Sequence, residues 1–255
     1  MTTSERRRWL ALAVVCLAQL MITLDTTIVN VALGRIQSDL HFTQSNLTWV
    51  INAFLVTFGS FLLLAGRLGD LVGRRRVFLA GVGLFTLSSI LCGLATDAAM
   101  LIGFRFLQGI GAAMQASVIL AIIVAEFREP AERTRAMSAY VFAAVAGGSL
   151  GLLAGGLLTQ LLNWHWIFFI NVPIGVVAIA VAVRVLESDR GPGLRAGADA
   201  LGAVLVTAAL MLGVYTIVET GRYGWWSVHT IGLGTVVAVL LAAFVVRQAK
   251  AARPL

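Results

Sequence analysis

Between two long apolar stretches of the chain lies the segment GRLGDLVGRRR, residues 66–76. Its glycines permit a tight turn between adjacent helices. Asp70 lies among arginines, so it can accept their hydrogen bonds or cap the N-terminus of the following helix. A plain connecting loop would need only the arginines, and the added glycine and aspartate positions therefore predict a latch. The residues of this predicted gating loop are Gly66, Asp70, Gly73, Arg74 and Arg75.

The composition around this segment is that of a membrane protein. Of the 255 residues, 59% are hydrophobic and only 12% are charged, against roughly a quarter charged in soluble domains. A soluble protein of this size could not bury that much apolar surface. The net charge of +7 comes from short arginine clusters between apolar runs, which argues against a disordered chain and against a nucleic-acid partner. The lipid bilayer is the predicted surrounding.

The apolar runs predict eight membrane-spanning helices. A helix needs about 20 apolar residues to cross the hydrocarbon, whereas barrel strands are about half as long and alternate in polarity. No stretch alternates, so the predicted fold is an all-α membrane protein. The predicted spans are residues 9–33, 47–65, 77–95, 99–124, 136–161, 166–186, 199–218 and 228–246.

The basic residues predict the orientation and the domains. The N-terminal cluster, the segment 66–76 and the clusters at 128–135, 184–195 and 247–253 all fall on one side, with only Arg35 and Arg222 on the other. By the positive-inside rule both termini are cytoplasmic. Residues 1–186 are predicted to form a six-helix bundle, residues 187–198 a cytoplasmic linker, and residues 199–255 two further spans with a C-terminal tail.

Two ionisable residues are predicted at membrane depth, where charge is costly and marks function or pairing. At 1.5 Å per residue, Asp25 lies roughly 24 Å from the cytoplasmic edge and Arg105 roughly 9 Å from the other edge. In a core about 30 Å thick these depths match. The two side chains are expected to face one water-filled cavity, with Asp25 as a protonatable carboxylate. The alternative is a static structural ion pair.

Other polar and small residues extend this pattern. The predicted cavity-lining residues are Asn30, Asn52, Gln108 and Gln115, although each could also simply bond between helices. The glycines of the fifth span repeat at small-residue spacing and predict a groove for close helix packing. These glycines are Gly147, Gly151, Gly155 and Gly156.

The sequence lacks the motifs of several kinds of catalytic and cofactor-binding site. The chain has no G-x-x-x-x-G-K-[ST] segment and no H-E-x-x-H segment. Met114 occupies the last glycine position of an incomplete dinucleotide fingerprint that begins at Gly109. Cys16 and Cys92 both lie inside apolar runs and show no metal-type spacing. The sequence therefore predicts no enzyme, no metal and no cofactor.

The segment 66–76 resembles the signature between helices two and three of the major facilitator superfamily, G-x-L-x-D-x-x-G-[RK]-[RK]. Residues 101–113, which include Arg105 and Gln108, look like the fourth-helix motif of that superfamily. Residues 24–33, LDTTIVNVAL, and residues 164–175, WHWIFFINVPIG, resemble motifs of its fourteen-span drug/proton antiporters of the EmrB/QacA type. The chain departs from the family pattern at Gly34, Leu152 and His165, where Pro, Pro and Arg are usual.

The resemblance implies a proton-driven exporter of drugs or other amphipathic small molecules in a bacterial inner membrane. Asp25 would carry the proton, Arg105 would tune it, and the loop at Gly66 would gate the cytoplasmic side. The family has a second six-helix bundle, with the site between the bundles. The chain alone is therefore expected not to transport unless it forms a homodimer or pairs with a C-terminal-half polypeptide. The alternatives are a non-transporting, truncated membrane protein or assembly partner, and a facilitator or channel without proton coupling.

Overall fold

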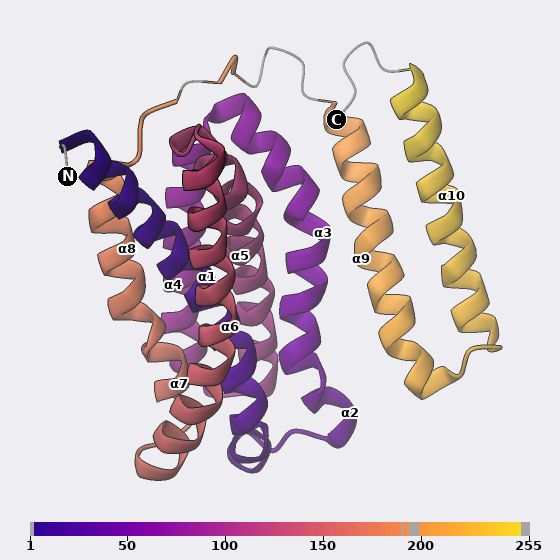
Figure 1. Cartoon of the computed structure of the whole chain (residues 1–255). Coiled ribbons are helices and arrows are strands. Elements are labelled where there is room, and N and C mark those ends of the chain that lie inside the picture. The colour runs from indigo at the N-terminus through magenta and orange to yellow at the C-terminus, as the bar shows by residue number, and fades with distance from the viewer. Residues whose placement is uncertain (1–2, 190, 194–198, 251–255) are drawn as a thin grey trace.

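The computed structural model describes residues 3–189, 191–193 and 199–250. Arg190, Arg195 and Arg253 of the basic clusters, and much of the predicted linker, lie outside these residues. The described part of the chain is helical (Figure 1). Its helices are α1 (Thr3–Asp39), α2 (Gln44–Leu47), α3 (Trp49–Val72), α4 (Arg74–Gly93), α5 (Ala98–Glu126), α6 (Pro130–Leu161), α7 (Trp166–Phe169), α8 (Asn171–Val185), α9 (Ala200–Tyr223) and α10 (Val228–Lys250).

Within the described residues, eight helical segments are long and apolar enough to cross a membrane. The predicted all-α fold with eight spans is confirmed, and the chain is a multi-pass membrane protein. Most helices extend beyond the predicted apolar stretches; α1, for example, continues to Asp39 rather than ending near residue 33. Hydropathy detects only the part of a helix inside the hydrocarbon, whereas backbone hydrogen bonding continues into the polar ends.

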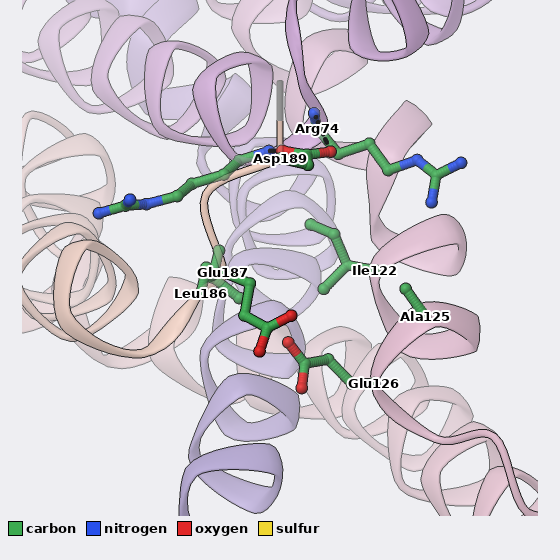
Figure 2. Close-up of a pocket in the computed structure, with 8 residues that line it drawn as sticks. Arg74, Ile122, Ala125, Glu126, Leu186, Glu187 and Asp189 are labelled. Carbon is green, nitrogen blue, oxygen red and sulfur yellow. Dashed lines mark hydrogen bonds between the residues drawn. The ribbon is translucent and has the colours of Figure 1, made fainter. Parts of the chain in front are cut away.

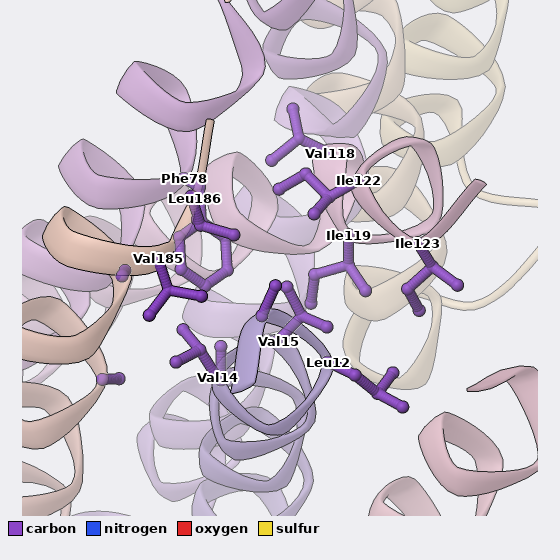
Figure 3. Close-up of a cluster of buried hydrophobic side chains, with 14 of the residues drawn as sticks. Leu12, Val14, Val15, Phe78, Val118, Ile119, Ile122, Ile123, Val185 and Leu186 are labelled. Carbon is purple, nitrogen blue, oxygen red and sulfur yellow. The ribbon is translucent and has the colours of Figure 1, made fainter. Parts of the chain in front are cut away.

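The first six spans form a bundle in which α1 packs along α6, and α3 and α4 both pack along α5. α8 closes the bundle against α1 and α4. One apolar core joins α1, α4, α5 and α8 (Figure 3), where the side chains of Val15, Phe78 and Ile119 are all fully buried. Since lipid is as apolar as these side chains, such a core stabilises the bundle through close packing rather than through removal from water.

The last two spans, α9 and α10, form a helical hairpin beside α3, at the side of the bundle (Figure 1). The Trp49 ring of α3 and the Tyr215 ring of α9 make part of this contact, with centroids 5.7 Å apart. Most of the α10 surface is exposed. The described part of the hairpin therefore packs on the outside of the bundle and contributes no side chain to the bundle's main apolar clusters.

Glycines of α6 form the seam with α1. A Cβ atom on Gly151 would collide with the Thr27 hydroxyl, and one on Gly155 would lie 3.1 Å from Ile28 Cγ1. Gly147 faces Thr23 in the same way. The prediction was wrong for Gly156, where a Cβ would have no described atom within 4 Å. One residue along a helix turns the side chain by about 100°, which carries Gly156 off the seam.

The predicted loop at residues 66–76 is mostly helix, and this corrects the sequence interpretation. α3 continues through Gly66 and Asp70 to Val72, and the turn to α4 is made at Gly73, whose φ is 111°. Only glycine adopts that φ without strain. Gly69, inside α3, lies so close to α5 that a Cβ would be 2.6 Å from Val118 Cγ1. The motif therefore combines one turn glycine with one packing glycine.

Candidate functional site

Asp25 of α1 and Arg105 of α5 form a direct ion pair in the bundle. The Arg105 Nη1 atom lies 2.5 Å from Asp25 Oδ2. The contact brings together the two ionisable residues that the sequence placed inside membrane spans. The two residues are 0% and 1% exposed, so in this conformation they are sealed among helices and do not face an open, water-filled cavity as expected.

Neutral side chains complete the coordination of the Asp25 carboxylate. Its Oδ1 atom accepts hydrogen bonds from Gln108 Nε2 at 2.9 Å and from Asn171 Nδ2 at 3.2 Å. Both amide groups also donate to the Ser89 hydroxyl, at 2.7 and 3.4 Å. Asp25, Ser89, Gln108 and Asn171 are each fully buried. The carboxylate thereby links α1 to α5 and α8, and the two amide groups extend the network to Ser89 of α4. We call these four residues and Arg105 the polar cluster.

The Arg105 guanidinium is also held by partners other than Asp25. It donates from Nε to the Val50 carbonyl of α3 at 2.9 Å and from Nη1 to Gln108 Oε1 at 2.7 Å. Its Cζ atom lies 4.5 Å from the Phe54 ring centroid and 6.0 Å from that of Phe168. Aromatic faces attract cations, more strongly when water is excluded. Arg105 therefore keeps several favourable contacts when the charge of Asp25 changes.

The remaining predicted cavity residues lie outside the polar cluster. Asn30 is exposed and bonds to the Thr26 carbonyl of its own helix at 2.6 Å. Asn52 is partly exposed on α3. Gln115 is fully buried on α5, and neither of its amide atoms has a partner among the described residues. Gln108 is thus the one of the four that the fold brings to Asp25.

Two members of the polar cluster, Ser89 and Asn171, were not predicted as site residues. Each is a polar residue within or beside an apolar run, which is a weak signal because such residues commonly bond only to their own helix. Their proximity to Asp25 depends on how α4 and α8 are rotated in the bundle. The spacing along the chain, 82 residues between them, carries no information about that rotation.

The turn at Gly73 is latched by Asp189, which follows α8 (Figure 2). Asp189 Oδ2 accepts the backbone N–H of Arg74 at 2.8 Å, and Oδ1 accepts that of Arg75 at 3.2 Å. Arg75 in turn donates from Nη2 to the Val183 carbonyl at 2.5 Å. The carboxylate therefore satisfies the free N–H groups at the start of α4.

Of the two roles predicted for Asp70, the capping role was wrong, because Asp70 lies inside α3 and Asp189 accepts the N–H groups at the start of α4. The Asp70 carboxylate oxygen lies 3.7 Å from Arg74 Nη2, and both side chains are largely exposed. Nearby, Arg7 of α1 pairs with Glu187 at 2.7 Å and with Glu126 of α5 at 3.4 Å. The described contacts at this end of the bundle therefore tie α1, α4 and α5 to the segment that follows α8.

Ionisable residues buried inside a membrane bundle commonly mark ion, proton or substrate pathways. Residues 15–249 match the sequence profile of the Major Facilitator Superfamily. The match includes most of the chain, and the chain belongs to this superfamily of membrane transporters.

Relatives with 39–40% identity extend this assignment. They include the cephamycin export protein CmcT of Amycolatopsis lactamdurans, 40% identical over 96% of this chain and 51% of the relative. The puromycin resistance protein of Streptomyces alboniger is 39% identical over 98% of this chain and 50% of the relative. The uncharacterized MFS-type transporter EfpA of Mycobacterium tuberculosis is 39% identical over 92% of this chain and 44% of the relative. The chain thus spans about half the length of the curated relatives that it matches.

The fold also resembles a solved structure. The crystal structure of a peptide transporter, the E310Q mutant of POT in complex with sulfate, superposes with a TM-score of 0.68 over 94% of this chain and 52% of the other. The sequence identity is 16%, so the likeness concerns the fold alone.

Proposed function

We propose that this chain forms the proton-coupling half of a drug/proton antiporter of the fourteen-span type. Asp25 takes up and releases the proton, and Arg105 adjusts how readily it does so. The observation that carries this proposal is the buried polar cluster, where the carboxylate of Asp25 in α1 bonds to side chains of both α5 and α8. The export and resistance functions named for the relatives support the direction of transport and a small amphipathic substrate.

Protonation of Asp25 would change the forces between helices. As a carboxylate, Asp25 attracts Arg105 and accepts bonds from Gln108 and Asn171. A proton on either oxygen removes its charge and converts one acceptor into a donor. The attraction between α1 and the helices α5 and α8 then weakens, while Arg105 keeps the Val50 carbonyl and the Phe54 ring. Proton uptake thereby favours a different arrangement of α1.

The sealed geometry supports alternating access to the proton. Since Asp25 is 0% exposed, a proton reaches it only when the helices around it separate. Opening towards one side at a time would couple proton movement to the conformational change. A static ion pair would need no such opening, and this difference makes the two interpretations testable.

The rest of the transport site is proposed to come from a second bundle. The matched region is about half of each relative, and in inverted-repeat transporters the substrate site lies between the two bundles. The second bundle would come from a further segment, from a second copy of this chain or from a C-terminal-half polypeptide. We place the protein in a bacterial inner membrane, since its relatives are bacterial. Both ends of the chain would lie in the cytoplasm, because the basic clusters gather at that end of the helices.

Everted membrane vesicles from native host cells, which supply any second bundle, test the proton-coupling role with the full chain. An imposed pH gradient is followed with acridine orange while ethidium is added as the substrate probe. The wild type is expected to dissipate the gradient, and Asp25→Asn to abolish the response. Glu129→Gln, which neutralises an exposed carboxylate at the start of α6, serves as the matched control. A wild-type response retained in a folded Asp25→Asn variant would refute the coupling role.

The mass of the purified assembly tests the second-bundle proposal. Native mass spectrometry of the protein extracted with its lipids is expected to show a second copy or a second polypeptide. A single chain that still exchanges protons for ethidium would show that no second bundle is needed. A single chain that is folded but inactive even with a C-terminal-half polypeptide present would favour a non-transporting protein.

A further inference from the structure

α9 carries a buried carboxylate that has no partner in the described part of the chain. Glu219 is 9% exposed and lies inside the span Leu201–Tyr223. No described group forms a hydrogen bond or an ion pair with it. Because most of this side chain is covered and little water reaches it, a cation or a hydrogen-bond donor would stabilise the carboxylate. The unpaired carboxylate of Glu219 therefore indicates a site for a ligand that supplies positive charge.

Glu219 lines a cleft of about 270 Å³ between α9 and the start of α3. Charged and polar residues line this cleft, and Arg222 is one of the charged residues. Arg222 itself is exposed and lies over the Tyr223 ring at 5.3 Å. The other residues that line it are Asn46, Thr48, Trp49, Val218 and Gly221. The cleft thus presents a negative and a positive group to the same ligand.

A second cleft of about 420 Å³ adjoins the first, because Trp49 lines both. Its walls come from α3, α5, α9 and α10 and are almost wholly apolar. Tyr215 contributes to it and lies four residues before Glu219, so both side chains lie on the same face of α9. The lining residues are Trp49, Val56, Phe106, Ala208, Met211, Leu212, Tyr215 and Leu240.

The order of the two clefts along α9 matches the order of the layers in a bilayer. After α9 come Trp225 and Trp226, which are 65% and 89% exposed, and such aromatic residues gather at the membrane–water interface. The charged cleft at Glu219 therefore lies at headgroup level. The apolar cleft at Met211 and Tyr215 lies further into the hydrocarbon.

We propose that these clefts hold one phospholipid with an ethanolamine headgroup. The primary ammonium donates hydrogen bonds to Glu219, the phosphate pairs with Arg222, and an acyl chain fills the cleft beside Trp49. An anionic headgroup would meet Glu219 without compensation, and an amphipathic cation would meet Arg222. A choline headgroup has no N–H to donate to the carboxylate. The lipid thereby fastens the α9–α10 hairpin to α3.

The test extracts the full chain from membranes in lipid nanodiscs and identifies the retained lipid by native mass spectrometry. The wild type is expected to retain phosphatidylethanolamine. Because an amide oxygen binds an ammonium group more weakly than a carboxylate does, Glu219→Gln should lower retention at least about tenfold. Arg222→Gln should lower it as well. Glu129→Gln, which neutralises a carboxylate far from the cleft in sequence, should retain the lipid like the wild type.

A second measurement uses the wild-type fold and locates the lipid. Phosphatidylethanolamine and phosphatidylcholine brominated on an acyl chain are compared as quenchers of tryptophan fluorescence. Stronger quenching by the ethanolamine lipid is expected, and the difference should disappear in Trp49→Phe. Equal quenching by both lipids, retention of an anionic lipid instead, or unchanged retention in Glu219→Gln would each overturn the proposal. Occupation of the cleft by ethidium in preference to lipid would overturn it too.

Discussion

The carboxylate of Asp189 accepts the backbone N–H of Arg74 at 2.8 Å, across 115 residues of sequence. Through this bond the segment that follows α8 caps α4 and holds the turn at Gly73. The cap connects the end of the six-helix bundle to the motif that resembles the family signature. A conformational change that moves α8 relative to α4 must break it.

Removal of this cap should destabilise the protein measurably. Loss of an N-cap side chain costs about 1 kcal/mol, so Asp189→Ala should lower the midpoint of thermal unfolding in detergent. Asp70→Ala is the matched control, since its exposed ion pair at 3.7 Å contributes less than about 1 kcal/mol. An equal or larger loss for Asp70→Ala would mean that Asp70, and not Asp189, fastens the turn.

The buried ion pair should show strong coupling between its two members. Removing one partner of a buried pair costs about 3–5 kcal/mol, because the other charge stays uncompensated. Arg105→Gln should therefore destabilise the protein more than the double variant Asp25→Asn with Arg105→Gln. Unfolding in detergent, followed by circular dichroism, measures Asp25→Asn, Arg105→Gln and the double variant in a double-mutant cycle.

Asn30→Ala is the control for this cycle, because Asn30 is exposed on the same helix as Asp25. Its effect should stay within about 0.5 kcal/mol. Additive effects of the two single substitutions at Asp25 and Arg105 would show that the pair is energetically uncoupled.

The glycine seam offers a comparison between two residues of one helix. Gly151→Ala would force a Cβ against Thr27 and within 2.9 Å of the Leu24 carbonyl, and such overpacking costs typically about 1–3 kcal/mol. Gly156→Ala meets no described atom within 4 Å and should be neutral or stabilising by up to about 1 kcal/mol. Thermal unfolding of the two variants, measured side by side, shows which substitution destabilises the protein more. The reverse order would place α6 in another rotation.

The pH dependence of the α9–α10 hairpin follows from Asp199, which lies just before the span formed by α9. The backbone N–H of Gly202 is the main cause that lowers the pKa of Asp199 below its ordinary value, and Arg247 and Gln248 lower it further. A lowered folded-state pKa means that this stabilisation is present above the unfolded pKa, near about 4. It is lost as the pH falls through the folded pKa.

We therefore expect Asp199→Asn to melt below the wild type at pH 7, because it lacks the charged cap and the Arg247 pair. The difference between the two melting temperatures should shrink as the pH is lowered from about 5 towards 3. A difference that stays constant over this range would show that the charge of Asp199 does not stabilise the hairpin.

Much of the fold follows from local properties of the chain. Apolar runs of spanning length predict the helices, and a charge inside two of them, at Asp25 and Arg105, predicts the pair because unpaired charge in lipid is costly. Ser89 and Asn171 could not be assigned in this way. A buried hydroxyl or amide group can form hydrogen bonds with many kinds of partner. Its role therefore depends on which neighbouring helix its side chain faces.

The sequence by itself determined the membrane setting, the number of spans and the presence of one acid and one guanidinium inside them, since each depends on composition or on position along a helix. The tertiary structure decided that Asp189 rather than Asp70 caps α4, that Gly156 lies off the seam formed by Gly151, and that Glu219 faces a cleft without a partner. Those outcomes depend on the rotation and contact of helices that are distant in the chain, and rotation is set by packing of whole surfaces.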